Sequence, residues 1–261
     1  MTIHHKTLSE LKSWFSGYVD TFRSTDPDDR KNIELKEEHT RRVCEEILDI
    51  GQSLQLSDED LHLAEITALF HDIGRFEQYA RYGTFSDLLS EDHALLGVRV
   101  LQKHRVLDSL DPETRDLILR TVSYHNRATL PKEETTRCLF FTKLLRDADK
   151  LDIWRVVTDY YRQKDGVRNG TIELNLPDTP EISQDVYKDA TAGRTIRTVS
   201  LKTLNDFKVL QMGWVFDVNF KRTFQLVRER RYLEMIRDAL PRTRKTSDIY
   251  SAARSCLERS C

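Results

Sequence analysis

The sequence contains no apolar run that approaches the roughly 20 residues needed to cross a bilayer. Its first residues, Met1 to Lys6, lack the apolar stretch and the small-residue cleavage site of a secretory signal. The four cysteines form no CxxC pair, and Cys44 and Cys138 lie among apolar residues, so we expect reduced thiols rather than a disulfide framework. These absences predict a cytoplasmic protein without a membrane partner.

The chain also has little net charge. Its 41 lysines and arginines nearly balance its 43 aspartates and glutamates, which leaves a formal net charge of −2. Such a chain has no general attraction to nucleic acid, so we expect no nucleic-acid partner. Basic residues do gather after Pro241, where we expect a solvated tail rather than a nucleic-acid contact. With 39% hydrophobic and 32% charged residues, the composition is typical of a folded protein that buries a substantial core.

Helical periodicity dominates the chain. Between Thr7 and Phe22 the apolar residues recur every three or four positions, which predicts an amphipathic helix. Further helices are expected at about 33–56, 58–73, 90–102, 112–124, 135–163, 200–219 and 221–240, with an ordered loop at 75–89. Glycines and prolines break the pattern between Asp165 and Val199, where residues 171–176 alternate like a short strand. The predicted class is therefore all-α, with one irregular segment that could include a short β-strand.

Four of the eight histidines fall on the inward faces of four separate predicted helices. A single inward histidine is more often a core residue than a ligand. Four of them, joined by two acids on buried faces, are costly to bury unless a divalent cation compensates them all. Imidazole with carboxylate suits one or two transition metal ions, and the lack of inward cysteines argues against a thiolate zinc site. The candidate metal ligands are His39, His71, Asp72, His93, His125 and Asp149.

The order and local context of these residues resemble the HD-domain metal-dependent phosphohydrolase superfamily. His39, the pair His71-Asp72, and Asp149 match its H...HD...D pattern, and the two further histidines resemble its binuclear branch. Residues 69–75, LFHDIGR, look like its HDIG-type core, and residues 147–152, DADKLD, look like its ADKLD-type segment. The resemblance covers roughly residues 39–152. It implies a helical-bundle HD-domain core with a metal site at 33–165, preceded by an N-terminal docking helix at 1–32. Residues 166–261 would then be an irregular segment and C-terminal helices that pack on the core.

The resemblance also implies the chemistry. One metal would be held by His39, His71, Asp72 and Asp149, and Asp72 would bridge to a second metal held by His93 and His125. A metal-bound hydroxide would then hydrolyse a phosphate ester of a small metabolite or nucleotide. Manganese, iron, cobalt, nickel and zinc are not distinguished by these ligands.

Within this scheme we expect His71, Asp72, Arg75 and Lys150 to be catalytic. Arg75, where the family often has lysine, and Lys150 would also bind the phosphate. Asn126 and Thr84 are further candidates for substrate binding. Asp92 and Asn126, each beside a proposed histidine ligand, could support the ligands or orient substrate, although capping and loop solvation explain them equally well. Ser90 is the expected cap of the helix at 90–102. Asp147 and Asp152 compete with Asp149 for one ligand position, and Asp147 is the second choice.

Two alternatives to this activity stay open at this stage. A di-iron oxygenase of the inositol-oxygenase type uses nearly the same ligands, and a non-catalytic nucleotide-binding regulatory module could keep an inherited site. Hydrolysis of cyclic dinucleotides is not supported, because no GYP-type segment follows His125. The apolar stripe from Leu8 to Phe22 could serve a homo-oligomer as easily as the core of one chain. Residues 166–199 could cover the pocket or only connect the helices on either side.

Overall fold

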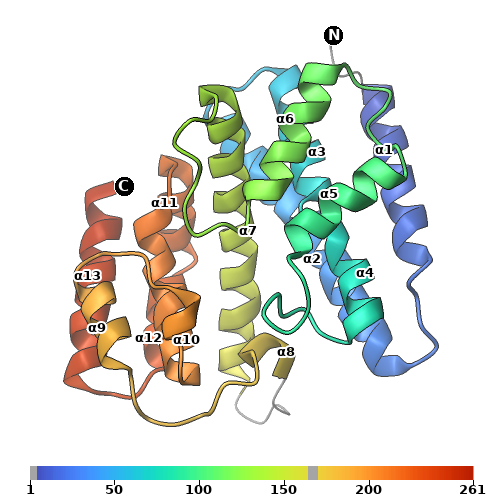
Figure 1. Cartoon of the computed structure of the whole chain (residues 1–261). Coiled ribbons are helices and arrows are strands. Elements are labelled where there is room, and N and C mark those ends of the chain that lie inside the picture. The colour runs from blue at the N-terminus through green and yellow to red at the C-terminus, as the bar shows by residue number, and fades with distance from the viewer. Residues whose placement is uncertain (1–4, 164–169, 261) are drawn as a thin grey trace. The chain divides into compact units, whose positions relative to one another are not determined.

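The computed structural model describes residues 5–163 and 170–260, and over these residues it is helical without any β-strand (Figure 1). This confirms the predicted all-α class. The chain divides into two compact units, Met1–Asp149 and Lys150–Cys261. In the described ranges, no helix combines the length and the apolarity needed to span a membrane.

The first unit carries the candidate site. It consists of α1 (His5–Asp20), α2 (Pro27–Ser53), α3 (Asp58–Phe70), α4 (Ile73–Tyr82), α5 (His93–Lys103), α6 (Pro112–Tyr124) and the first half of α7 (Thr136–Arg162). Helix α2 packs along α3, α4 packs along α5, and α6 contacts both α3 and α5. The apolar stripe of α2 is fully buried at Val43, Ile47 and Ile50, so the face that carries His39 points into this core.

Two helix starts follow directly from local capping. Asp111 accepts a hydrogen bond from the backbone of Thr114, and Pro112 opens α6 as predicted. In α2 the residues 26–29 begin the helix, because Asp26 accepts from the amides of Asp28 and Asp29. The expected start near residue 33 was therefore wrong by six residues. Aspartate followed by proline suits a cap as well as a turn.

The expected loop at 75–89 was also wrong over its first half. Helix α4 runs to Tyr82 and ends at Gly83, whose φ of +64° is a left-handed conformation that favours glycine. Its periodicity was hidden because a polar residue, Gln78, is fully buried beside Phe76. The loop that remains, residues 84–92, ends where Asp92 rather than Ser90 caps α5.

Two glycines bring α4 and α5 together. A Cβ on Gly74 would lie 2.2 Å from the carbonyl oxygen of His93 and 2.5 Å from the amide nitrogen of Gly97. Any side chain at position 74 would therefore push the two backbones apart. This close approach places His93, at the start of α5, beside the residues that precede α4.

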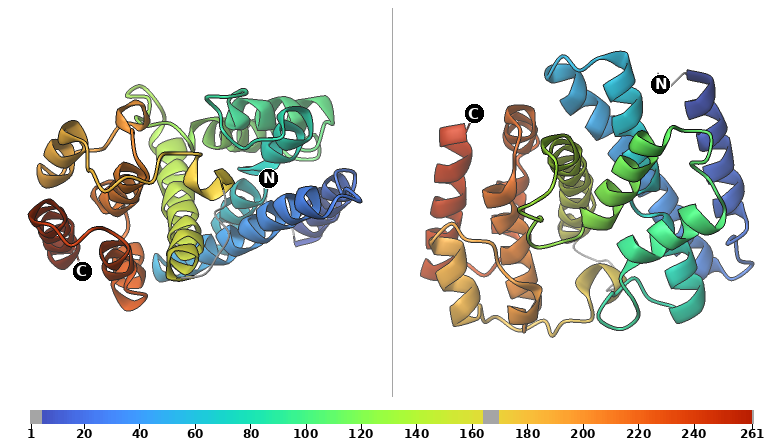
Figure 2. Two further views of the ribbon diagram at one scale, coloured as in Figure 1. Left: turned by 90° about the horizontal axis from the view of Figure 1, so that it is seen from below. Right: turned by 45° about the horizontal axis from the view of Figure 1, so that its top comes forward.

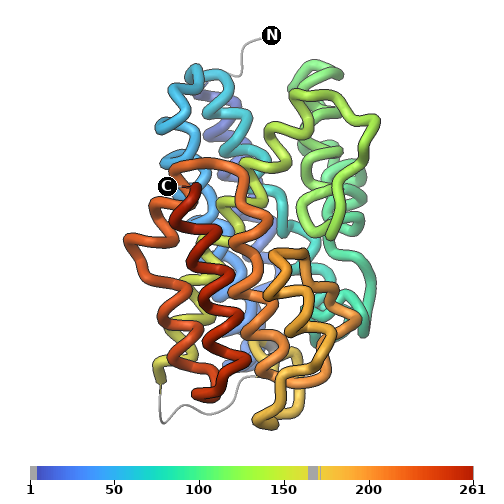
Figure 3. Tube along the Cα trace, turned by 90° about the vertical axis from the view of Figure 1, so that its left-hand side faces the viewer, coloured from blue at the N-terminus to red at the C-terminus, as the bar shows by residue number. Residues whose placement is uncertain are grey.

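The second unit comprises the rest of α7 followed by α8 (Gly170–Glu173), α9 (Gln184–Thr191), η1 (Thr198–Ser200), α10 (Leu204–Gly213), η2 (Trp214–Asp217), α11 (Lys221–Glu229), α12 (Tyr232–Asp238) and α13 (Arg244–Ser260). The short strand expected at 171–176 was wrong, since α8 and a turn occupy it. Six alternating residues without a partner strand do not make a sheet. The solvated tail expected after Pro241 was also wrong. It forms α13, drawn in red in Figure 3, which buries Ile249, Ala253 and Leu257 and packs on α9 and α12.

Candidate metal centre

Six predicted ligands converge within the first unit. Figure 2 shows the ribbon of the helices that carry them from two further sides. His39 lies within α2, the pair His71-Asp72 lies between α3 and α4, and His93 opens α5. The exposed fractions of these residues are 5% for His39, 0% for His71, 3% for Asp72, 3% for His93 and 5% for His125. The side chain of Asp149, on α7, is 18% exposed. The cluster is thus buried, with its opening on the side of Asp149.

One group of donor atoms forms around His39. Its Nε2 lies 3.2 Å from Nε2 of His71, 3.2 Å from Oδ1 of Asp149 and 3.6 Å from Oδ2 of Asp72. The Nε2 of His71 lies 3.8 Å from the same Asp72 oxygen. His39, His71 and Asp72 are thus spaced so that they could hold a metal ion.

A second group uses the other oxygen of Asp72. Its Oδ1 lies 3.3 Å from Nε2 of His93 and 3.8 Å from Nε2 of His125, and these two nitrogens are 3.0 Å apart. Asp72, His93 and His125 could also hold a metal ion. Asp72 therefore presents one carboxylate oxygen to each group.

The outer ring nitrogens determine where the protons are. Nδ1 of His71 lies 2.7 Å from the carbonyl oxygen of Ala68, and Nδ1 of His125 lies 2.7 Å from that of Val122. A carbonyl oxygen only accepts, so both Nδ1 atoms carry a proton, and the Nε2 atom of each ring faces the cluster. Burial lowers the pKa of His71 to about 4, so this ring is neutral near pH 7.

The outer ring nitrogen of His93 also carries a proton. Its Nδ1 donates to Oδ2 of Asp87 at 2.7 Å. Burial, followed by the nearby Arg75 charge, lowers the pKa of His93 to about 4. Its Nε2 therefore presents a lone pair and lies 3.0 Å from Nε2 of His125.

A cation would satisfy this group of acceptors. The Nε2 atoms of the neutral rings of His71 and His93 and the oxygens of two ionised carboxylates lie close together. The donor set of imidazole nitrogens and carboxylate oxygens is the one that transition metal ions take, so the residues fit a metal centre.

Two cations of the chain lie against Asp72. Nζ of Lys36 donates to Oδ2 at 2.8 Å, and Nε of Arg75 lies 3.5 Å from Oδ1. Burial by itself would raise the pKa of Asp72, but Lys36 and the other nearby positive groups outweigh it and hold that pKa well below its usual range. Burial is likewise outweighed at Asp149, where the contact with His39 keeps the carboxyl pKa below its usual range. Both carboxylates are therefore ionised and available as ligands.

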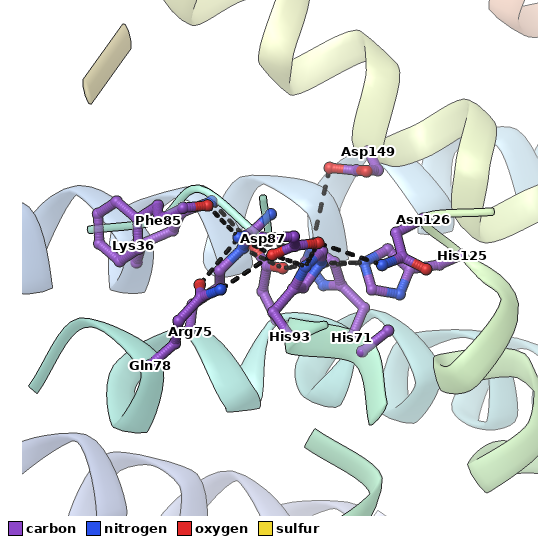
Figure 4. Close-up of polar contacts among 12 residues, drawn as sticks. Lys36, His71, Arg75, Gln78, Phe85, Asp87, His93, His125, Asn126 and Asp149 are labelled. Atoms are coloured by element: carbon purple, nitrogen blue, oxygen red, sulfur yellow. Dashed lines mark hydrogen bonds and ion pairs between the residues drawn. The ribbon is translucent and has the colours of Figure 1, made fainter. Parts of the chain in front are cut away.

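Asp87 is a site residue that sequence reasoning missed (Figure 4). Besides His93, its carboxylate accepts from Nη1 of Arg75 at 2.8 Å and from Nε2 of Gln78 at 2.9 Å. Burial would raise the pKa of Asp87, but the hydrogen bond from His93 and the charges around it lower that pKa below its usual range. Asp87 lies in the loop after α4, where no periodicity shows which way a side chain points. Only its position six residues before His93 hinted at a role.

Lys36 was missed although a signal existed. It precedes His39 by three residues on α2, and residues three apart share a helix face. Because His39 was expected to point inward, a lysine on the same face could have been expected to meet the carboxylates around it.

The predicted substrate-binding residues lie at different distances from the cluster. Arg75 lies within the cluster, held by Asp87 and Gln78. The exposed Asn126 donates to Oδ1 of Asp92 at 3.0 Å and to Oδ2 of Asp87 at 3.4 Å, which places it at the edge of the cluster. The Thr84 hydroxyl accepts from a backbone amide within its own loop.

Among the residues predicted on α7, Asp149 contacts the cluster through its bond to His39. Its competitors Asp147 and Asp152 are fully buried. The ammonium of Lys150 pairs with Asp217 of the second unit, at 2.8 Å from Oδ2 and 3.0 Å from the carbonyl oxygen. Adjacent positions on a helix thus face different surroundings.

A separate groove of about 620 Å³ lies between α1, α2 and α3 and contains none of the clustered ligands. Cys44 lines it, and burial raises the pKa of this thiol to about 12. Its Sγ donates to the carbonyl oxygen of Glu65. The thiol is therefore not a nucleophile near neutral pH.

Together, the helical fold and the buried cluster define a protein domain that could hold metal ions between its helices. Residues 37–154 match the family model described as HD domain, which supports the resemblance of this stretch to the HD-domain superfamily. HD domains are typical of metal-dependent hydrolases and bind divalent metals. Comparison with curated proteins and with solved structures gives no match.

Proposed function

We propose that this chain is a metal-dependent phosphohydrolase with two divalent cations, acting on a phosphate ester of a small metabolite or nucleotide. The observation that carries the proposal is the division of Asp72, whose two oxygens each face a separate group of imidazole nitrogens. A carboxylate in that position is suited to bridge two ions.

His39, His71 and Asp149 would join one oxygen of Asp72 around the first cation. His93 and His125 would join its other oxygen around the second. When bound, such a pair of cations supplies an acidified water near neutral pH and neutralises the oxygens of a phosphoryl group. The match of residues 37–154 to the HD-domain family model supports this class of chemistry.

The chain's own cations support an anionic substrate. Lys36 and Arg75 lie against opposite oxygens of Asp72, one beside each group of ligands. The contacts of the Arg75 guanidinium within the described residues use Nη1 and Nε, which leaves Nη2 able to donate to a phosphoryl oxygen. Asp87 and Gln78 hold the guanidinium in place for that contact.

Metal analysis combined with a phosphatase panel tests the proposal. Protein purified without added metal should contain more than one equivalent of transition metal, and manganese or cobalt should restore phosphate release after chelation. Asp72→Ala should lose both ions and all release, whereas Asp20→Ala, a change on the surface of α1, should lose neither. The proposal fails if the wild type binds no stoichiometric metal or if Asp72→Ala retains it. Oxygen consumption by the iron-loaded protein, without phosphate release under any metal, would assign an oxygenase instead.

A further inference from the structure

The ammonium of Lys36 occupies the same carboxylate oxygen that the first ligand group uses. Its Nζ lies 2.8 Å from Oδ2 of Asp72, and this oxygen lies 3.6 Å from Nε2 of His39 and 3.8 Å from Nε2 of His71. Lys36 is thus the direct counter-ion of the residue on which both groups depend.

A metal ion held by that group would meet the ammonium at close range. A cation bound to Oδ2 and a lysine hydrogen-bonded to the same oxygen are separated by only a few ångströms. Asp72 is 3% exposed, so little water is present to screen their repulsion. The arrangement around Oδ2 therefore favours one positive partner at a time.

The side chain of Lys36 can move away from Asp72 and bind another partner. Its side chain is 18% exposed, and its four-carbon stem allows the ammonium to move by several ångströms. The ring centroid of Phe85, 5.4 Å from Nζ, offers a face for it near the cluster (Figure 4). Within the described residues, its hydrogen bond is to Asp72, so an ammonium released from there is left to bind an anion.

We propose that a divalent cation displaces Lys36 from Asp72, and that the released ammonium binds an oxygen of the substrate's phosphoryl group beside Phe85. Lys36 would balance the charge of Asp72 in the metal-free centre and would bind phosphate only in the loaded centre. This couples anion binding to metal loading. The inference rests on the proposed function, because it uses the same metal centre.

The first test is manganese affinity. Titration calorimetry compares the wild type with Lys36→Met and with Lys31→Met, a control on the same helix whose side chain is 76% exposed. Removal of the competing ammonium should tighten binding of the first manganese ion about tenfold, whereas the control should bind as the wild type does. Lys36→Gln, which keeps a donor without the charge, replaces the methionine variant if that variant misfolds.

The second test is phosphate affinity and needs no turnover. Inorganic phosphate is titrated into the manganese-loaded proteins. Lys36→Met should bind it about tenfold more weakly than the wild type, and Lys36→Arg, which keeps the charge, should retain most of the affinity. The metal-free Lys36→Met protein should also melt at a lower temperature, with manganese restoring more of the difference than in the wild type, because Asp72 keeps only the Arg75 cation until the metal binds.

The outcomes separate this inference from the proposed function. If the wild type binds no manganese, the proposed function fails and the inference fails with it. If the wild type binds manganese but Lys36→Met binds it with unchanged or weaker affinity, displacement is refuted and the metal centre stands. If phosphate binding is unchanged in Lys36→Met, the anion-binding role is refuted.

Discussion

The replacement Asp87→Asn should weaken one metal position and spare the other. The carboxylate of Asp87 accepts from His93 at 2.7 Å, Arg75 at 2.8 Å and Gln78 at 2.9 Å. Asparagine keeps one acceptor oxygen but turns the other position into a donor and removes the charge. The Nδ1 proton of His93 is then held by a neutral amide oxygen at best and no longer by a charged carboxylate, so the ring is fixed less firmly toward Asp72.

The size of the effect follows from these contacts. Each charge-assisted hydrogen bond contributes about 1.5–3 kcal/mol. The side chain of Asp87 is 32% exposed, so water replaces part of what is lost. A partner of this kind behind a histidine ligand is typically worth about 10–100-fold in metal affinity, or about 1.4–2.7 kcal/mol. We therefore expect the dissociation constant of the second ion to rise by that factor.

Stepwise calorimetric titration with manganese measures the two ions separately. The step assigned to the group around His39 should be unchanged, because that group faces the other oxygen of Asp72. Asp92→Asn is the matched control, since its remaining carbonyl oxygen can still accept from the amides of Ala94 and Leu95 that it caps. Equal weakening of both steps, or no weakening of either, would refute the reasoning.

Three further outcomes are expected. Asp72→Gln should lose both metal ions together, because each group loses its carboxylate oxygen; elemental analysis that finds one ion retained would contradict a shared ligand. For the metal-free protein, the pKa of His71 and His93 lies at about 4 in the folded state against an ordinary value of 6.5, so the unfolded chain binds more protons at acid pH. The free energy of unfolding should therefore reach its full value above pH 6.5 and fall as the pH drops toward 4, by about 3 kcal/mol per ring. A free energy of unfolding from urea denaturation that does not change across this range would contradict the burial of neutral rings. Gly74→Ala should destabilise by about 3 kcal/mol, because its Cβ meets backbone atoms, whereas Gly17→Ala in α1, with nothing within 4 Å, should stabilise by about 0.5–1 kcal/mol; similar melting temperatures for the two variants would contradict the close approach of α4 and α5.

Much of the fold was predictable where periodicity is strong. Helices α6 and α7 were predicted to within one residue at each end, because their apolar stripes are regular and Asp111-Pro112 marks the start of α6. Helix α4 was missed because its inward face includes the amide of Gln78, which breaks the apolar pattern while anchoring the loop through Ser90 and Glu91. Short helices whose buried residues are polar leave little trace in hydropathy.

Helix α13 of the second unit was also not predicted from the sequence. Helix α13 is amphipathic, with Ile249, Ala253 and Leu257 spaced four apart, but its arginines and its place at the end of the chain suggested a solvated tail. Its burial depends on α9 and α12, which the local sequence does not describe. Tertiary packing, rather than composition, makes it part of a core.

The sequence by itself determined which helix faces bear His39, His71, His93 and His125, since the period of a helix is a local property. It also carried the resemblance that the family match confirms. Only the tertiary structure decided that Asp72 turns one oxygen to each pair of histidines, that Lys36 takes one of those oxygens, and that Asp87 stands behind His93. The direction of a carboxylate between helices, or of a side chain on a loop, depends on partners distant in the chain, and no local period records them.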